Sequence, residues 1–173
     1  MCKKNLYIFF VLFLSFSQTS LAQRKVNTQA YDLMLQELLK HDVKECTVAQ
    51  ADSIRRNKHV VFIDTREKRE YDVSHLPNAI WVGYHNFDTS RLYGISKDTE
   101  IIAYCSVGAR SEQIVRQLSA LGYSKLSNMY GSIFEWVNQG LPIVDKYEKP
   151  TNKVHAYNKT WGIWLRKGDK VYD

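Results

Sequence analysis

The stretch that decides the fold is IIAYCSVGAR, residues 101–110. Its first four residues form a short, continuous apolar run, which is typical of a strand buried in a parallel sheet. Residues 109–121 then place their apolar side chains on one face of a helix, and Gly122 is a suitable C-cap. The sequence therefore places Cys105 at the junction of a buried strand and a helix.

The rest of the chain continues this alternation of strand and helix. A helical pattern begins after Thr28, which is a plausible N-cap. Alternation of this kind predicts an α/β fold with a central parallel sheet flanked by helices on both faces. Further strands are expected at 46–48, 60–63, 80–82 and 126–130, and further helices at 49–56, 67–73 and 132–139.

The first 22 residues have the layout of a secretory signal peptide. Two lysines precede an apolar stretch at 6–14, and Ser20-Leu21-Ala22 is a small-x-small cleavage signal. The apolar stretch is shorter than the ~20 residues that span a bilayer, although an uncleaved N-terminal anchor is the alternative. We expect cleavage between Ala22 and Gln23 and an exported protein, periplasmic or secreted, with no membrane contact after cleavage.

The segments after residue 22 differ in character. We expect a leader and helix at 23–44, one α/β domain at 45–145 and an aromatic C-terminal extension at 146–173 that packs on the domain. Trp161, Ile163 and Leu165 alternate as the residues of a half-buried strand would. A docking surface for a partner is the alternative interpretation of the extension.

Composition and charge fit one ordinary globular domain. The 173 residues are 45% hydrophobic and 24% charged. The net charge of +6 would fall to +4 with the loss of two lysines in the signal peptide. The basic residues are scattered, so we expect no nucleic-acid partner, although the positive field favours anionic substrates. No cysteine and histidine cluster has the spacing of metal ligands, and we expect no metal site.

Three local effects at Cys105 favour a thiolate over a thiol. Gly108 lets the loop curl tightly, and the helix that starts near Ala109 aims its free N–H groups at the sulfur. Arg110 adds a positive charge. The same cradle would hold a persulfide, which is also anionic. The alternatives are a buried, inert cysteine and a disulfide with Cys46, and the setting of Cys105 favours a free, reactive thiol.

The loop from Cys105 to Arg110 resembles the active-site loop of the rhodanese family, which starts with cysteine and ends with arginine. The resemblance covers about residues 45–145, and its one mild departure is Gly131-Ser132, where the family often has two glycines. Two flanking motifs agree with it: Asp64-Thr65-Arg66, Glu70-Tyr71 and His75-Leu76-Pro77-Asn78-Ala79 upstream, and Tyr130-Gly131-Ser132 to Gly140-Leu141-Pro142 downstream.

The resemblance implies a sulfurtransferase. Cys105 would take sulfane sulfur from a small anionic donor such as thiosulfate and pass it to cyanide or a thiol, without a cofactor. Four residues separate Cys105 from Arg110. The family's phosphatase relatives have a loop that is one residue longer, so the shorter loop favours sulfur transfer.

The resemblance also assigns roles to other residues. Arg110 and the backbone of Ser106, Val107, Gly108 and Ala109 would bind the donor. Asp64, Arg66, Glu70, His75 and Gly131 would be structural. Asp64 and Arg66 would pair with each other or cap neighbouring turns, Glu70 and His75 would bond the loop backbone, and His75 is more simply a structural histidine than an acid or base.

Other functions use the same features. An exported persulfide or redox relay would need a protein-thiol acceptor. A non-catalytic binding module would use the scaffold and the aromatic extension, although the presence of Cys105 counts against it. Phosphatase or arsenate chemistry is a further alternative.

Overall fold

The computed structural model describes Val26, residues 28–57 and residues 59–173. The predicted signal peptide and its cleavage site after Ala22 lie outside the described residues. Within them, no helix is both long and apolar enough to cross a membrane.

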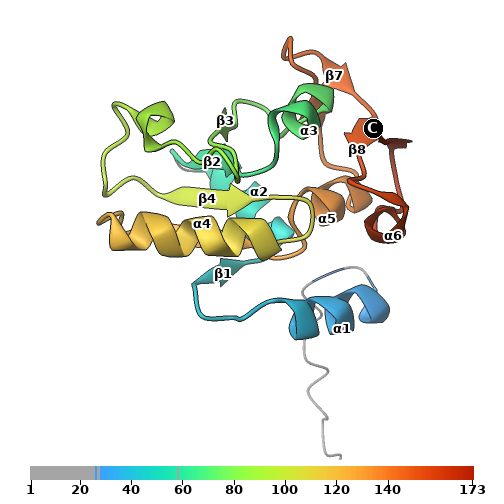
Figure 1. The fold of residues 1–173 in the computed structure, drawn as a ribbon, viewed down its shortest axis with the longest axis horizontal. Helices are drawn as coiled ribbons and strands as arrows, with labels where there is room; N and C mark the ends of the chain where they lie inside the picture. Colours follow the sequence, from blue (N-terminus) through green and yellow to red (C-terminus); the bar gives the residue numbers. More distant parts are fainter. Residues whose placement is uncertain (1–25, 27, 58) are drawn as a thin grey trace, which may run out of the picture.

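A five-stranded parallel sheet organises the described part of the chain, in the order β1-β5-β4-β2-β3. Strand β4 lies at its centre and leads directly into Cys105 (Figure 1). This architecture confirms the predicted α/β fold. The strands are β1 Glu45–Cys46, β2 Val61–Asp64, β3 Ile80–Trp81, β4 Ile101–Tyr104 and β5 Leu126–Met129.

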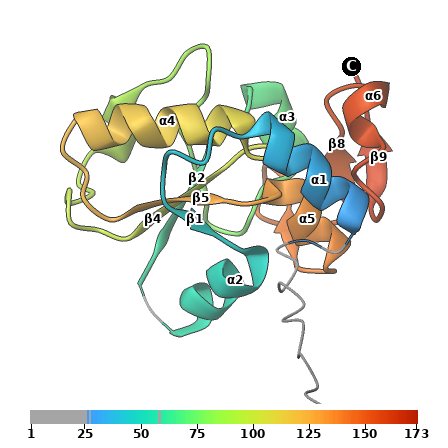
Figure 2. The same ribbon diagram turned by 90° about the horizontal axis from the view of Figure 1, so that it is seen from below.

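The two faces of the sheet bury separate clusters because successive side chains of a strand point to opposite faces. Ile63 and Ala103 lie in the cluster with residues of α4 (Ala109–Ala120). Phe62 and Ile102 lie in the cluster that includes residues of α2 (Val48–Asn57) and α5 (Ser132–Asn138). Figure 2 shows α4 on one side of the strands and α2 on the other.

Capping residues mark the starts of helices α1 and α3. Helix α1 (Gln29–Leu38) starts after Thr28, whose side chain accepts a hydrogen bond from Tyr31 N–H at 3.3 Å, as the sequence predicts. Helix α3 (Lys68–Val73) starts with a capping box between Glu67 and Glu70. The connection between β3 and β4 contains one short 3-10 helix, η1 (Thr89–Leu92).

The end of the chain forms short strands and one helical turn. Strand β6 pairs with β7 antiparallel, and β8 pairs with β9 parallel. The predicted strand over Trp161 to Leu165 is wrong, because Asn158 accepts a hydrogen bond from Trp161 N–H at 3.0 Å and starts a helix. The elements are β6 Ile143–Val144, β7 Pro150–Thr151, β8 Lys153–His155, α6 Lys159–Gly162 and β9 Asp169–Val171.

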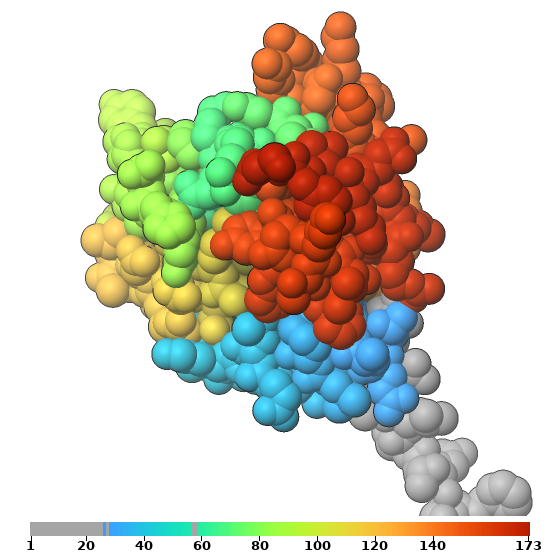
Figure 3. All heavy atoms as spheres, turned by 45° about the vertical axis from the view of Figure 1, so that its right-hand side comes forward, coloured from blue at the N-terminus to red at the C-terminus, as the bar shows by residue number. Residues whose placement is uncertain are grey.

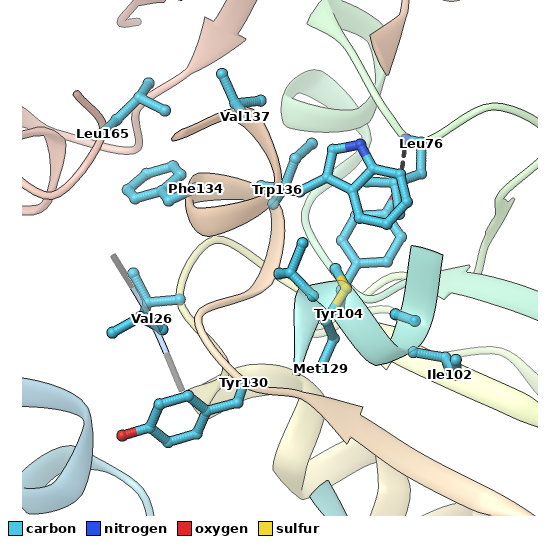
Figure 4. Packing of buried hydrophobic residues seen from close by; sticks show 14 of the residues in the cluster. Val26, Leu76, Ile102, Tyr104, Met129, Tyr130, Phe134, Trp136, Val137 and Leu165 are labelled. Carbon is cyan, nitrogen blue, oxygen red and sulfur yellow. Dashed lines mark hydrogen bonds between the residues drawn. The ribbon is translucent and has the colours of Figure 1, made fainter. Parts of the chain in front are cut away.

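The C-terminal extension shares the core of the domain. Val154, Ala156 and Leu165 are fully buried in the same cluster as Phe134 and Trp136 of α5. Figure 4 shows Leu165 near Phe134. The backbone of the extension is also bound to α5. The Asn138 side chain donates to Trp164 O at 2.9 Å and accepts from Arg166 N–H at 2.7 Å. In addition, the rings of Tyr31 and Trp164 stack with their centroids 5.4 Å apart.

Replacing Leu165 with alanine should destabilise the whole domain. Leu165 is fully buried, and a buried Leu→Ala change costs ~2–5 kcal/mol. Ile163 is the matched control because it lies two residues earlier and is 62% exposed; its replacement by alanine should change stability by at most about 0.5 kcal/mol. Urea denaturation of the two variants makes the comparison, and equal free energies of unfolding would contradict the shared core.

Candidate active site

The Cys105 loop turns at Gly108, which caps the N-terminus of α4. Gly108 has φ 127°, and its N–H donates to Cys105 Sγ at 3.1 Å. A Cβ atom at this position would meet Leu39 at 3.5 Å, an ordinary contact distance. The backbone angle therefore requires glycine here, and lack of space does not.

The start of α5 holds the other side of the loop. Ile133 N–H donates to Cys105 O at 3.2 Å, and Phe134 N–H donates to Ser106 O at 3.1 Å. Cys105 N–H in turn donates to Ser132 Oγ at 3.1 Å. Three hydrogen bonds to the first residues of α5 thus fix the backbone of the loop beside the reactive sulfur.

Gly131 and Ser132 both adopt left-handed backbone angles, with φ 76° and 51°. A Cβ atom at Gly131 would lie 2.8 Å from Glu135 Cβ and 2.9 Å from Val26 Cγ1, so only glycine fits. Ser132 is the departure from the two-glycine pattern, and its hydroxyl donates to Met129 O at 3.0 Å. Ser132 was not predicted as a site residue, although its hydroxyl bridges β5 and the Cys105 loop.

Ser111 and Asn128 support the loop from within α4 and β5. Ser111 Oγ lies 3.1 Å from Gly108 O and 2.6 Å from Asn128 Oδ1, and Asn128 Nδ2 donates to Gly108 O at 3.1 Å. Neither residue was selected from the sequence. Ser111 lies in the first turn of α4, where its hydroxyl faces back toward the helix N-terminus. A serine at this position is the signal in the sequence that could have identified it as a site residue.

Glu70 of α3 binds the side chains of the loop. Its buried carboxylate accepts from Arg110 Nη1 at 2.6 Å and from Nη2 at 2.8 Å, and from Ser106 Oγ at 3.2 Å. Arg110 Nη2 also donates to Ser106 Oγ at 2.9 Å. The expectation that Glu70 bonds the loop backbone is therefore wrong, because a buried carboxylate within reach of a guanidinium forms the stronger charge-assisted pair.

His75 lies away from the loop, so the expectation that it bonds the loop backbone is also wrong. Its Nδ1 is 3.0 Å from Tyr71 O and its Nε2 is 2.9 Å from Glu148 Oε1. Its ring stacks on Tyr71 with the centroids 3.7 Å apart, and its backbone pairs with Val144. His75 therefore joins α3 to the β6–β7 hairpin. Both of its ring nitrogens have partners there, so they do not bond the Cys105 loop.

Asp64 and Arg66 pair with each other at the carboxyl end of β2. Both side chains are fully buried, and Arg66 Nε donates to Asp64 Oδ1 at 3.0 Å while Nη2 donates to Oδ2 at 2.6 Å. Arg66 Nη2 also donates to Ser74 O, and Trp81 Nε1 donates to Arg66 O at 2.8 Å. The pair thus joins β2, β3 and the end of α3 behind the Cys105 loop.

The two described cysteines differ in their ionisation. Burial of Cys105 opposes the thiolate, but the Arg110 charge and hydrogen bonds from Ser111 and Gly108 outweigh it and lower the pKa of the thiol. Burial raises the pKa of Cys46 to about 12. Both are free thiols, so no Cys46–Cys105 disulfide forms. Cys105 is thus the better nucleophile at neutral pH.

Cys105 opens into a pocket of about 150 Å³. Of the predicted site residues, Cys105, Ser106, Val107, Ala109 and Arg110 line it, while Gly108 lies behind the sulfur. Leu38, Tyr157 and Trp161 complete the lining and were not predicted. Among the described residues, no group of three or more histidine, cysteine, aspartate and glutamate side chains is arranged to hold a metal ion.

Replacing Arg110 with methionine should raise the pKa of Cys105, because the variant loses the positive charge beside the sulfur. Thiolate reacts with iodoacetamide, so the pH profile of alkylation at Cys105 should move to higher pH. Arg116→Met is the matched control, since Arg116 lies on the same helix and pairs with Asp42 and Glu112. An unchanged pH profile in Arg110→Met would contradict the inference that the Arg110 charge lowers the pKa of Cys105.

Glu70→Gln should weaken the fold near neutral pH and lose this effect in acid. The bonds from Arg110 overcome burial and lower the pKa of Glu70 from 4.5 to about 2. The ionised pair therefore stabilises the fold above pH 4.5, and this stabilisation fades as the pH falls toward 2.

At pH 7 the parent should exceed Glu70→Gln in free energy of unfolding by on the order of 3 kcal/mol. The difference should narrow between pH 4.5 and pH 3. Denaturant titrations across this range measure it, with the exposed Glu37→Gln as the matched control. A difference that is independent of pH would rule out the ionised pair.

The rhodanese-like domain family matches residues 47–139 of the chain. A sulfurtransferase from Allochromatium vinosum is 35% identical over 85 residues, which cover 49% of this chain and 78% of that protein. The thiosulfate:glutathione sulfurtransferase of Saccharomyces cerevisiae is 32% identical over 98 residues, or 50% of this chain and 70% of the relative. A tRNA uridine(34) hydroxylase from Buchnera aphidicola is 28% identical, and the match covers 43% of its length.

Solved structures share the fold. A rhodanese-like domain from Anabaena sp. superposes with a TM-score of 0.53 at 18% identity, covering 58% of this chain and 78% of that one. A thiosulfate sulfurtransferase from Pseudomonas aeruginosa gives 0.54 at 17% identity, over 67% of this chain and 22% of that one. The family match spans more than half of the sequence and contains the whole Cys105 loop. The chain therefore belongs to the rhodanese-like domain family.

Proposed function

We propose that this protein is a sulfurtransferase that carries sulfane sulfur as a persulfide on Cys105. The observation that carries the proposal is the environment of Cys105 Sγ, which accepts the Gly108 N–H at 3.1 Å in a pocket that Arg110 also lines. The lowered pKa of the thiol supports it, because the thiolate is the nucleophilic form. Two relatives with sulfurtransferase names support the same chemistry.

In the first step, the Cys105 thiolate attacks the outer sulfur of a donor such as thiosulfate. A new S–S bond forms at Cys105, the S–S bond of the donor breaks, and sulfite leaves with the electron pair of that bond. The step is nucleophilic covalent catalysis, and it needs no oxidant or reductant. The Gly108 N–H that now faces Sγ would stabilise negative charge on the persulfide.

In the second step, cyanide or a thiolate attacks the outer sulfur of the persulfide. The bond between the two sulfurs breaks, and its electron pair returns to Cys105 as the thiolate. The products with cyanide are thiocyanate and the starting enzyme. The same environment that lowers the pKa of Cys105 makes it a good leaving group here.

Arg110 would bind the anionic donor while Glu70 and Ser106 hold it in place. A guanidinium has five N–H donors, so it can serve both side chains and still face an anion in the pocket. The backbone of residues 106–109 would contribute further donors around the sulfur. The predicted export of the protein is part of this proposal and would put the reaction in the periplasm or outside the cell.

Thiocyanate formation from thiosulfate and cyanide tests the proposal, with Cys105→Ala beside the parent. We expect the parent to form thiocyanate and Cys105→Ala to lose turnover, because the variant lacks the thiolate that takes up the sulfur. Cys46→Ala is the matched control: it removes the other described thiol, whose pKa is about 12, and should keep turnover. Turnover by Cys105→Ala, or no thiocyanate from a folded parent, would contradict sulfur transfer through Cys105.

A further inference from the structure

Part of the Cys105 pocket is built by residues outside the family match at 47–139. Leu38 comes from the end of α1, and Tyr157 and Trp161 come from the C-terminal extension. All three present apolar or aromatic surface. Figure 3 shows the extension, in orange and red, against α1, in blue below it, and against the yellow start of α4 beside it.

Tyr157 also covers the cation of the site. Its ring centroid lies 5.2 Å from the guanidinium carbon of Arg110, a cation–π distance. Glu70 binds the same guanidinium through two hydrogen bonds and holds it in place. The Arg110 charge therefore acts inside the pocket, on Cys105 and on a small anion that would bind there.

The backbone holds Tyr157 firmly in this position. Tyr157 has φ 65°, a left-handed angle that costs energy in a residue other than glycine. Its N–H donates to Nδ1 of the buried His155 at 3.1 Å, and His155 Nε2 lies 3.0 Å from Asp173 Oδ1. Because Nδ1 accepts this bond, Nε2 carries the proton that bonds Asp173. Asn158 N–H then returns to Ala156 O at 2.8 Å and closes the turn around Tyr157.

Tyr157 and Trp161 together form an aromatic wall of the Cys105 pocket, and this pocket is small. Its volume of about 150 Å³ equals that of roughly five water molecules at ~30 Å³ each. Pockets for drug-sized ligands hold ~300–1,000 Å³. Thiosulfate, cyanide or a short thiol can enter such a space whole, whereas a tripeptide thiol must leave most of its atoms outside the aromatic wall.

We propose that Tyr157 and Trp161 are specificity-determining residues that restrict the Cys105 persulfide to compact acceptors and disfavour tripeptide and protein thiols. The inference rests on the proposed function and deepens it by naming the class of acceptor. The transfer itself is balanced, since a small thiolate takes the outer sulfur as its own persulfide and Cys105 leaves as the thiolate. The yeast relative is named for glutathione, so the wall would separate this chain from that activity.

The access of reagents to Cys105 tests the wall without any sulfur transfer. Iodoacetamide is compact, and iodoacetamidofluorescein carries the same reactive group on a bulky anion. Peptide mass spectrometry gives the rate of each at Cys105. In Trp161→Ala and Tyr157→Ala, the ratio of the bulky to the compact rate should rise roughly tenfold or more, as expected when a pocket loses a contact that rejects a ligand.

Three control variants separate loss of the ring from other effects. Tyr157→Phe and Trp161→Phe keep an aromatic ring and should keep the parent ratio. Tyr147→Ala removes an exposed ring of the extension that does not line the pocket. If Tyr157→Ala unfolds at its left-handed position, Trp161→Ala carries the test, and thermal melting identifies which variants are folded. An unchanged ratio in folded Trp161→Ala would overturn the proposal.

Turnover with glutathione and with cyanide then measures specificity directly. The ratio of kcat/KM for glutathione to that for cyanide should rise in the variants that lose a ring. If the parent forms neither product while the alkylation ratio still rises, the proposed function fails and the wall stands. If the parent transfers sulfur to glutathione as well as to cyanide, and the variants do not change the ratio, the function stands and the wall is excluded.

Discussion

The site depends on one buried ion pair, between Glu70 of α3 and Arg110 of α4. A carboxylate that is fully removed from water is costly unless charged donors bind it, and Arg110 supplies two hydrogen bonds in a planar fork. Ser106 is drawn into the same network. The pair therefore fixes both the shape of the loop and the position of the positive charge that lowers the pKa of Cys105.

The loop is held on its other side by backbone groups, so its geometry exists before any substrate arrives. The first residues of α5 bind the carbonyl groups of Cys105 and Ser106, and Ser132 receives the Cys105 N–H. Donors fixed in this way need no reorganisation when charge develops on the sulfur. The structure thus holds the Arg110 charge in place between α3 and α4, and it holds the backbone of the Cys105 loop in place against α5.

Environment gives chemically identical groups different behaviour in this chain. Cys46 and Cys105 are both buried, yet burial is the main cause that raises the pKa of Cys46 to about 12, while charge and hydrogen bonds outweigh burial at Cys105. The arginines of the two buried pairs likewise have different roles. Arg66 joins elements behind the loop, whereas Arg110 reaches the pocket, where the aromatic extension covers it.

The sequence by itself determined the parallel α/β fold, the helix from Ala109, the cap at Thr28 and the strand–loop–helix setting of Cys105. These follow from apolar runs, caps and glycines, which act within a few residues of the chain. Only the tertiary structure decided that Glu70 binds Arg110, that Ser132 holds the loop and that Tyr157 and Trp161 wall the pocket. It also replaced the expected strand at Trp161 with a helical turn. Such contacts join residues tens of positions apart, and they depend on how elements pack, which local patterns do not encode.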